Sequence, residues 1–267
     1  MDTEDWSLGI VGGTGMLGRE IAAAIVRAGV VPTERLWISS RRGADGAPDA
    51  LRSCNHTTRN QALADACDVI LISVPPAAVN DIAIKARDKL IISVMAGVSI
   101  ETLQRTTGSS RVVRAMSSPA AGQALAYSPW CAHPEVTEED RSRTQAILSV
   151  CGLTDEIEAE AHIDCFTALT GPVPGFVAFF AEAMADYAES QGIAPELADR
   201  AVRQLFRGAA AVMSDSAMTP SDHVQQMIDY AGTTAAGLQE LRRLGTGSAI
   251  SQGLDAAKRR AGNIAPR

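Results

Sequence analysis

Five glycines lie within the ten residues Gly9–Gly18, GIVGGTGMLG, directly after the start of a short apolar run. Gly13, Gly15 and Gly18 match the spacing G-x-G-x-x-G at the junction of an expected strand and an expected helix. The first glycine permits a tight turn, the second lets a pyrophosphate approach the backbone, and the third lets the helix pack on the strand. The loop therefore predicts a dinucleotide site at a helix N-terminus, with a purely structural turn as the alternative.

Short apolar strands alternate with helical patterns through the first half of the chain. The expected strands are Leu8–Val11, Leu36–Ile38, Val69–Val74, Leu90–Val94 and Val112–Met116, and the expected helices between them are Met16–Arg27, Ala77–Arg87 and Ile100–Arg105. Apolar strands that alternate with helices are typical of a parallel sheet covered on both faces. The sequence thus predicts an N-terminal Rossmann-type, doubly wound α/β domain.

The second half contains helical patterns and no convincing strand between His162 and Gly262. The expected helices are Cys165–Ser190, Pro195–Ser214, Pro220–Tyr230 and Thr233–Leu244. Pro195 and Pro220 stand in the first turn of their helices, where proline is favoured. We therefore expect two domains: residues 1–157 bind the dinucleotide, and residues 158–267 form an all-α domain.

Composition excludes several other classes of protein. The net charge of −7 and the pI near 5.2 argue against a nucleic-acid partner or an anionic membrane surface. Apolar runs such as Val69–Val74 are too short to cross a bilayer, and the first residues are acidic where a signal peptide is basic. The five cysteines and four histidines show no metal-ligand or disulfide spacing. We expect a cytoplasmic protein without a metal site.

The residues after the second expected strand indicate which dinucleotide is bound. An NAD site places Asp or Glu there, whereas this chain reads WISSRRG at Trp37–Gly43. Hydroxyl and guanidinium groups suit a 2′-phosphate, which favours NADPH over NADH, with a solvated pair of loop charges as the alternative. The residues expected to contact the cofactor are Gly13, Thr14, Gly15, Met16, Leu17, Ser39, Ser40, Arg41, Arg42, Val74, Pro75 and Ala96.

Six longer segments resemble one family in their order and approximate spacing. They read CDVILISVPPAAV, LIISVMAGVSIETLQ, RVVRAMSSPA, HPEVTEEDR, ALTGPVPGFVAFFAEAMADYAESQGI and MIDYAGTTAAGLQEL. This set resembles the pyrroline-5-carboxylate reductases over nearly the whole chain, and the glycine loop is also similar to that of deazaflavin-dependent NADP reductases. The resemblance implies a Rossmann domain, a helical dimerisation domain and reduction of 1-pyrroline-5-carboxylate to proline with NAD(P)H. It also implies an active site at the dimer interface and leaves open whether dimers assemble into rings.

Three loops depart from the family's pattern. The chain reads MSSP where the family has MPNTP beside the nicotinamide, so Ser117 is the expected cofactor contact there. It reads TGPVPGF for SGSGPAY, where Thr170 is the candidate hydrogen-bond partner of the imine nitrogen and Pro174 lies beside the substrate. It reads DYAGTT, ending at Thr234, for SPGGTT. These departures leave the identity of the substrate open.

The DYAGTT segment supplies the remaining candidates. Gly232, Thr233 and Thr234, near a helix N-terminus, are expected to bind a carboxylate through amides and hydroxyls, with a plain helix cap as the alternative. Thr233 and Tyr230 are also candidate catalytic groups, Tyr230 as a proton donor, although simple packing is its alternative role. Hydride transfer to an electrophilic imine carbon asks mainly for positioning.

The apolar helical stripe suggests a partner surface. It consists of Phe166, Val177, Phe180, Met184 and Tyr187, and it predicts a homodimer through the C-terminal helices, with an internal core as the alternative. The prediction is an NADPH-dependent reductase of a cyclic imino acid. The alternatives are an NAD(P)-dependent oxidoreductase for another imine or small substrate, and a nucleotide-binding protein of this fold without turnover.

Overall fold

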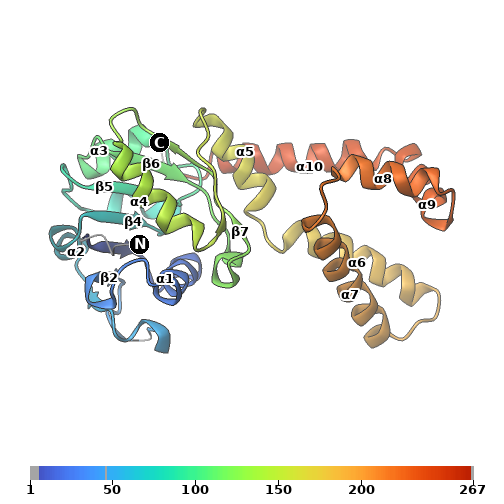
Figure 1. The fold of residues 1–267 in the computed structure, drawn as a ribbon, viewed down its shortest axis with the longest axis horizontal. Helices are drawn as coiled ribbons and strands as arrows, with labels where there is room; N and C mark the ends of the chain where they lie inside the picture. Colours follow the sequence, from blue (N-terminus) through green and yellow to red (C-terminus); the bar gives the residue numbers. More distant parts are fainter. Residues whose placement is uncertain (1–5, 46, 266–267) are drawn as a thin grey trace. The chain divides into compact units, whose positions relative to one another are not determined.

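The computed structural model describes residues 6–45 and 47–265, which fold into two compact units (Figure 1). The first unit extends to Val173 and takes up the chain again at Leu254, and the second is Pro174–Gly253. The boundary expected after residue 157 falls between the last strand and the helix that follows it. As a boundary between domains it stays a prediction.

The first unit is built on one twisted sheet of mostly parallel strands. Its order is β3-β2-β1-β4-β5-β6-β8, and only the edge strand β8 runs antiparallel to its neighbour among the described strands. The strands are β1 (Leu8–Val11), β2 (Leu36–Ser39), β3 (Asn55–Thr57), β4 (Val69–Ile72), β5 (Leu90–Ser93), β6 (Val112–Ala115) and β8 (Trp130–Ala132), and a separate ribbon pairs β7 (Ala126–Tyr127) with β9 (Gly152–Leu153). The predicted doubly wound sheet is confirmed, because the chain order reverses between β3-β2-β1 and β4-β5-β6.

Helices cover both faces of this sheet (Figure 1). They are α1 (Met16–Ala28), α2 (Asn60–Ala66), α3 (Ile100–Thr107), α4 (Glu138–Ser149), α5 (Ala161–Thr170) and the end of α10 (Thr246–Ala261). Val69 and Leu71 belong to the hydrophobic cluster that contains α1 and α4, whereas Ile70 and Ile72 belong to the cluster that contains α2 and α3. Because neighbouring residues of β4 are buried on opposite faces, the strand is apolar throughout, as the sequence pattern predicted.

Two expected helices are wrong. Residues 77–87 form a short 3-10 turn, Pro76–Asp81, followed by an irregular segment in which Ile82, Ile84 and Ala86 alternate with exposed neighbours. Ile82 has right-handed helical dihedral angles, but Ala83 takes φ +48°, so a continuous helix cannot run through this segment. The expected helix 165–190 is divided into α5 and α6 (Gly175–Ser190), because Pro172 and Pro174 interrupt it. The sequence analysis also missed β3, α2 and α4.

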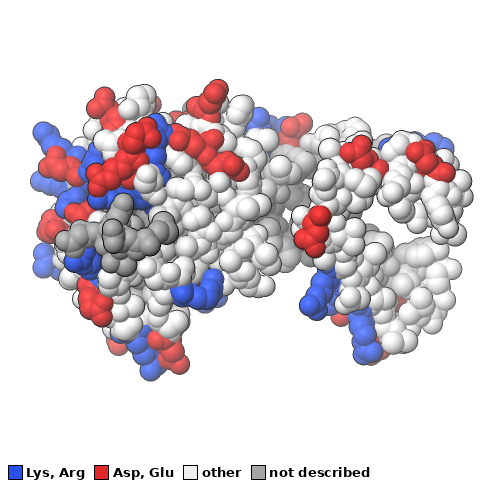
Figure 2. Space-filling view, in the orientation of Figure 1, with Lys and Arg blue, Asp and Glu red and all other residues white. Residues whose placement is uncertain are grey.

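The second unit consists of paired helices with exposed apolar side chains. Helix α6 packs against α7 (Pro195–Ser214), and α8 (Pro220–Asp229) packs against α9 (Thr233–Arg243). All residues of α6 are described and none is buried, with Phe179 63% and Tyr187 69% exposed. The face of α6–α9 drawn in Figure 2 carries few charged side chains. Apolar faces of this extent are typical of surfaces that another protein chain covers.

One segment of the described chain is long and apolar enough to cross a membrane by composition. It is Ala161–Ser190, with a mean hydropathy of 1.4 over its most apolar window, of which 11% is buried. The sequence analysis missed it because the apolar residues are spread over α5 and α6 instead of forming one run. The proline-containing break between the two helices favours a surface covered by protein over a continuous membrane helix.

Candidate functional site

The glycine loop after β1 forms a tight turn against the end of β4. Gly12 takes φ +82°, and a Cβ atom on it would lie 2.5 Å from the carbonyl oxygen of Ser73. Gly13 instead packs beside Ile38, whose Cγ2 would lie 2.9 Å from an added Cβ. The tight turn expected at Gly13 therefore contains both glycines, and Gly12 is the one that takes the positive φ. Both positions require glycine, one for its backbone conformation and one for space.

Helix α1 begins without a side-chain cap among the described residues. Gly15 is its N-cap residue, and the Gly15 amide donates to the carbonyl of Gly12 at 2.9 Å. A Cβ atom on Gly18 would collide with that carbonyl, so Gly18 lets the helix lie close to the loop. Within the described chain no side chain caps α1, and its first turn has no acidic residue. The first-turn amides and the helix dipole therefore form a site suited to a phosphate.

A cleft of about 850 Å³ opens beside this loop, at the carboxyl ends of β1, β2 and β4. Its lining includes Val11, Gly12, Thr14, Gly15, Ser39, Ser40, Arg41, Arg42, Thr58, Asn60, Ser73, Val74, Pro75, Ala78, Asp81 and Ile82. This is the crevice at which doubly wound sheets bind dinucleotides. A glycine cradle that side chains would fill, next to uncapped amides, suits the pyrophosphate of such a cofactor.

The far end of the cleft is polar and positively charged. The Ser39 hydroxyl is buried and donates to Oδ1 of Asn60 at 2.8 Å, and Nδ2 of Asn60 donates to the carbonyl of Ile82 at 2.9 Å. Arg41 and Arg42 are exposed, and no carboxylate among the described residues pairs with either. The sequence analysis missed Asn60 because it begins α2, a helix that was not expected.

A second cleft, of about 590 Å³, continues from the first, with Gly15, Ser73, Val74 and Pro75 lining both. Its other lining residues are Met16, Leu17, Pro76, Val94, Met95, Ala96, Ala115, Met116, Ser117, Pro119, Thr167, Ala168, Gly171, Pro172, Ala257, Arg260, Ala261 and Ile264. Together the two clefts bring together every expected cofactor contact except Gly13. The part these residues play in binding stays a prediction.

A buried arginine pairs with two partly exposed carboxylates beside the second cleft. Arg114 on β6 is 4% exposed and donates to Glu160 at 3.2 Å and to Asp164 at 2.5 Å. Glu160 also accepts the amide of Ile100 at 2.8 Å. Because Glu160 and Asp164 lie at the start of α5, these contacts hold that helix against the sheet.

The substrate-side candidates of α5 differ in what they contact. The Thr170 hydroxyl donates to the carbonyl of Phe166 at 3.0 Å and lies 3.3 Å from Sδ of Met116, and Thr170 does not line either cleft. Thr167, one turn earlier, lines the second cleft and donates to the carbonyl of Ile163 at 2.8 Å. Ser117 also lines it and accepts the Ser128 hydroxyl at 2.9 Å. The role of Thr170 stays a prediction, and Thr167 is a further candidate.

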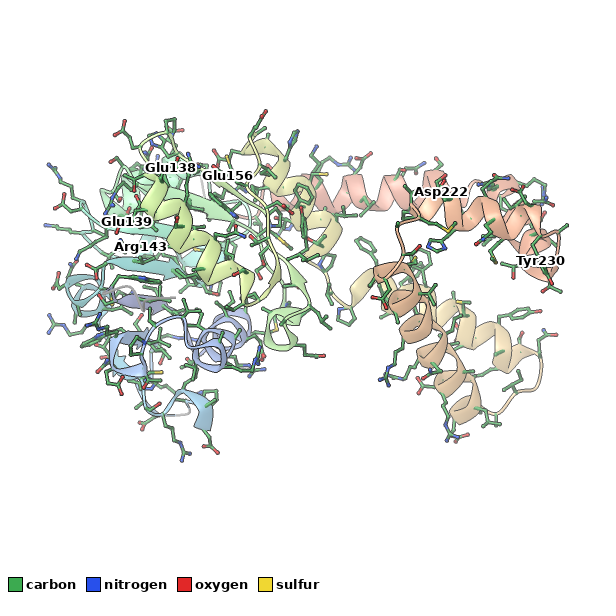
Figure 3. The ribbon with its side chains drawn as sticks, in the orientation of Figure 1. Glu138, Glu139, Arg143, Glu156, Asp222 and Tyr230 are labelled. Atoms are coloured by element: carbon green, nitrogen blue, oxygen red, sulfur yellow. The ribbon has the colours of Figure 1, made fainter. Side chains whose placement is uncertain are left out.

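The other substrate-side residues belong to the second unit. Pro174 is the N-cap residue of α6, and Gly232 is the N-cap residue of α9, which begins at Thr233. Within the described chain no side chain caps α9, so Gly232 caps the helix by its backbone, and both the carboxylate site and the plain helix cap stay open. Figure 3 labels Tyr230 at the α8–α9 turn, where it is 83% exposed.

The buried cysteines lie outside both clefts. Burial raises the pKa of Cys67 to about 12 and that of Cys151 to about 12, and Cys165 is the exposed cysteine. Among the described residues, no group of three or more His, Cys, Asp or Glu side chains could hold a metal ion. Glu139 and Arg143, labelled in Figure 3, form an ion pair along α4, far from either lining set. The two clefts therefore remain the candidate site.

Comparisons with known proteins agree with this geometry. Residues 160–264 match the family described as pyrroline-5-carboxylate reductase dimerisation, and residues 7–97 match NADP oxidoreductase coenzyme F420-dependent. The pyrroline-5-carboxylate reductase of Aquifex aeolicus is 32% identical over 186 residues, which are 68% of this chain and 70% of that protein. The chain belongs to the pyrroline-5-carboxylate reductase family. It is an NAD(P)-dependent oxidoreductase, and its N-terminal part is an NADP-binding domain.

Two further relatives extend the likeness over the whole chain. The pyrroline-5-carboxylate reductase of Pisum sativum is 27% identical over 97% of this chain and 96% of its own length. The crystal structure of the Plasmodium falciparum pyrroline carboxylate reductase with NADP bound has a TM-score of 0.81 at 25% identity, covering 98% of this chain and 99% of that one. The resemblance expected from the six segments is thus confirmed, and the dimerisation match supports a homodimer.

Proposed function

We propose that this chain reduces a cyclic imino acid with NADPH, and that 1-pyrroline-5-carboxylate, giving L-proline, is its substrate. The observation that carries the proposal is the continuity of the two clefts through Gly15 and Ser73–Pro75. It gives one dinucleotide room for its adenosine at the β2 end and its nicotinamide beside Ala96 and Ser117. The names of the relatives supply the substrate class.

The choice of NADPH rests on the end of β2. Ser39 and Ser40 are followed by two arginines, and the carboxylate in the cleft lining, Asp81, follows β4 instead. Guanidinium groups form charge-assisted hydrogen bonds with phosphate oxygens, whereas a ribose with free hydroxyls favours a carboxylate at this position. These groups support binding of a 2′-phosphate, and NADH is the weaker ligand in this proposal.

When bound, the cofactor supplies a hydride to the electrophilic imine carbon. In this proposal the chain holds the substrate carboxylate with the first-turn amides of α9 and the hydroxyls of Thr233 and Thr234, helped by the helix dipole. Thr170 holds the imine nitrogen by a hydrogen bond and Tyr230 is the candidate proton donor. The apolar walls of the second cleft exclude water, and positioning supplies most of the rate.

The assembly belongs to the same proposal. The exposed apolar side chains of α6, such as Val177 and Met184, are covered by a second copy of the chain in a homodimer that also forms the active site. Higher rings of dimers, and the cytoplasmic location expected from the composition, are parts of the proposal that the activity itself does not require.

The test is steady-state NADPH oxidation with three imino acids: 1-pyrroline-5-carboxylate, 1-pyrroline-2-carboxylate and 1-piperideine-2-carboxylate. A kcat/KM above about 10⁴ M⁻¹s⁻¹ for the first supports the proposal. Activity with another imine alone means that the MSSP and TGPVPGF loops have changed the substrate. If none is reduced while NADPH binds, the reductase proposal fails for this substrate class.

A pair of variants tests the carboxylate site. Thr233→Val combined with Thr234→Val is expected to raise KM for the imino acid while the Kd for NADPH is unchanged. Thr246→Val, at the start of α10, is the matched control because it removes the same hydroxyl from another helix N-terminus. An equal effect of the control would contradict the assignment of the α9 turn.

A further inference from the structure

The end of the chain packs against the turn between β5 and α3. Gly97, in that turn, takes φ +70°, and a Cβ atom on it would collide with the carbonyl oxygen of Ala261 and lie 2.8 Å from Cγ2 of Ile264. Ala261 is 5% exposed, and Ala265 packs against the cluster that contains α2 and α3. The residues after Leu254 therefore belong to the same compact unit as the sheet.

This docking brings Arg260 into the wall of the second cleft. Gly15, Met16 and Leu17, at the N-terminus of α1, line the same cleft. Among the described residues that line this cleft, Arg260 is the one with a charged side chain, and no carboxylate in the described chain pairs with it. Arg260 is exposed, and it lines a largely apolar cleft together with uncapped amides, two kinds of group that each bind an oxyanion.

A structural role does not account for this placement. A basic residue in the last turn of a helix interacts favourably with the helix dipole, but Lys258 and Arg259 stand in the same turn of α10. Neither of them lines the cleft. The helix dipole favours all three basic residues equally, so it does not explain why Arg260 alone among them lines the cleft.

We propose that Arg260 binds the pyrophosphate of the dinucleotide on its nicotinamide side, so that the C-terminal segment is part of the cofactor site. The inference rests on the proposed placement of NADPH across the two clefts and is independent of which imine is reduced. The α1 amides hold the pyrophosphate from one side, and the guanidinium holds it from the other. Gly97 is the position that allows the segment to come close enough.

Binding of NADP and of 2′,5′-ADP to Arg260→Ala, measured by calorimetric titration without substrate, tests the proposal. Because 2′,5′-ADP ends at the adenosine-side phosphate, it keeps the contacts at the β2 end and lacks the group that Arg260 binds. We expect Arg260→Ala to weaken NADP about tenfold, and 2′,5′-ADP less than about twofold. Arg259→Ala, the matched control from the same turn, is expected to leave both affinities within about twofold.

Three outcomes overturn the proposal. They are equal NADP affinity in the two variants, equal weakening of NADP and 2′,5′-ADP by Arg260→Ala, and a raised KM for the imino acid with unchanged NADP affinity. Arg260→Gln, which keeps the apolar stem, repeats the test if the alanine variant does not fold, as judged by circular dichroism. Because no substrate is present, the titration measures the affinity for NADP whether or not any of the three imino acids is reduced.

Discussion

Replacing Arg41 and Arg42 by alanine tests which dinucleotide the first cleft selects. Both guanidinium groups line the cleft beside Ser39 and Ser40, and both are exposed. Ser39 is held by Asn60, so its hydroxyl oxygen lies in a fixed position beside the two charges. The double variant removes the charges and leaves the serines, the glycine loop and the α1 amides in place.

The expected magnitude follows from the exposure of these groups. A hydrogen bond to a charged group contributes about 1.5–3 kcal/mol. Because both arginines are exposed to solvent, the lower end applies to each, which is about tenfold in Kd per arginine and about a hundredfold for the pair. NADH has no 2′-phosphate, so its Kd should change less than about twofold.

The assay is fluorescence titration of the free protein with NADPH and with NADH. Arg52→Ala is the control, because Arg52 pairs with Asp49 at the surface and lines neither cleft. Equal weakening of NADPH and NADH would show that the arginines act on a shared part of the cofactor. Unchanged NADPH binding would show that they are solvated loop charges, and either result refutes the reasoning.

Three further predictions concern stability. Arg114→Leu leaves the carboxylates of Glu160 and Asp164 without their cation and should lower the free energy of unfolding, measured in urea, by about 3 kcal/mol. The surface control Arg52→Leu should lower it by less than about 0.5 kcal/mol. Equal losses in the two variants would contradict the role of the Arg114 ion pairs. Ala231 takes φ +56°, so Ala231→Gly removes about 1–2 kcal/mol of left-handed strain from the folded state. The glycine also costs about 0.5–1 kcal/mol, because it gives the unfolded chain more backbone entropy, and the free energy of unfolding should therefore rise by about 0.5 kcal/mol. A decrease would argue against strain at this position. Burial raises the pKa of the Cys67 and Cys151 thiols from about 8.5 in the unfolded chain. The contribution of the two thiols to the free energy of unfolding is therefore complete below pH 8.5 and is lost as the pH rises toward about 12. Between pH 8.5 and 11, the free energy of unfolding measured in urea should fall less for a variant with alanine at both positions than for the unchanged chain.

Local patterns were sufficient to predict the strand, the glycine loop and the helix that border the first cleft. Strand, glycine turn and helix follow one another within Leu8–Ala28, so their geometry depends on neighbours in the sequence. The sequence analysis did not single out Gly12, which takes the positive φ and lies against the Ser73 carbonyl, from the adjacent Gly13. A motif locates such a turn without deciding which residue of a glycine pair adopts the unusual conformation.

Other features depend on contacts between distant segments. Asn60 reaches the cleft because β3 pairs with β2, and that short polar strand has no hydrophobic signal of its own. Arg260 enters the second cleft because the last residues of α10 meet Gly97, far away in the chain. Neither juxtaposition is encoded in local periodicity, so the sequence analysis missed both residues.

The interruption of the first compact unit between Val173 and Leu254 has a consequence for the order of folding. A growing chain can form β1–β6 and the glycine loop early, since these strands lie within the first 115 residues. The residues of the second cleft that follow Leu254, Ala257 and Ile264 among them, are synthesised after helices α6 to α9. A nascent chain should therefore form the first cleft well before it completes the second.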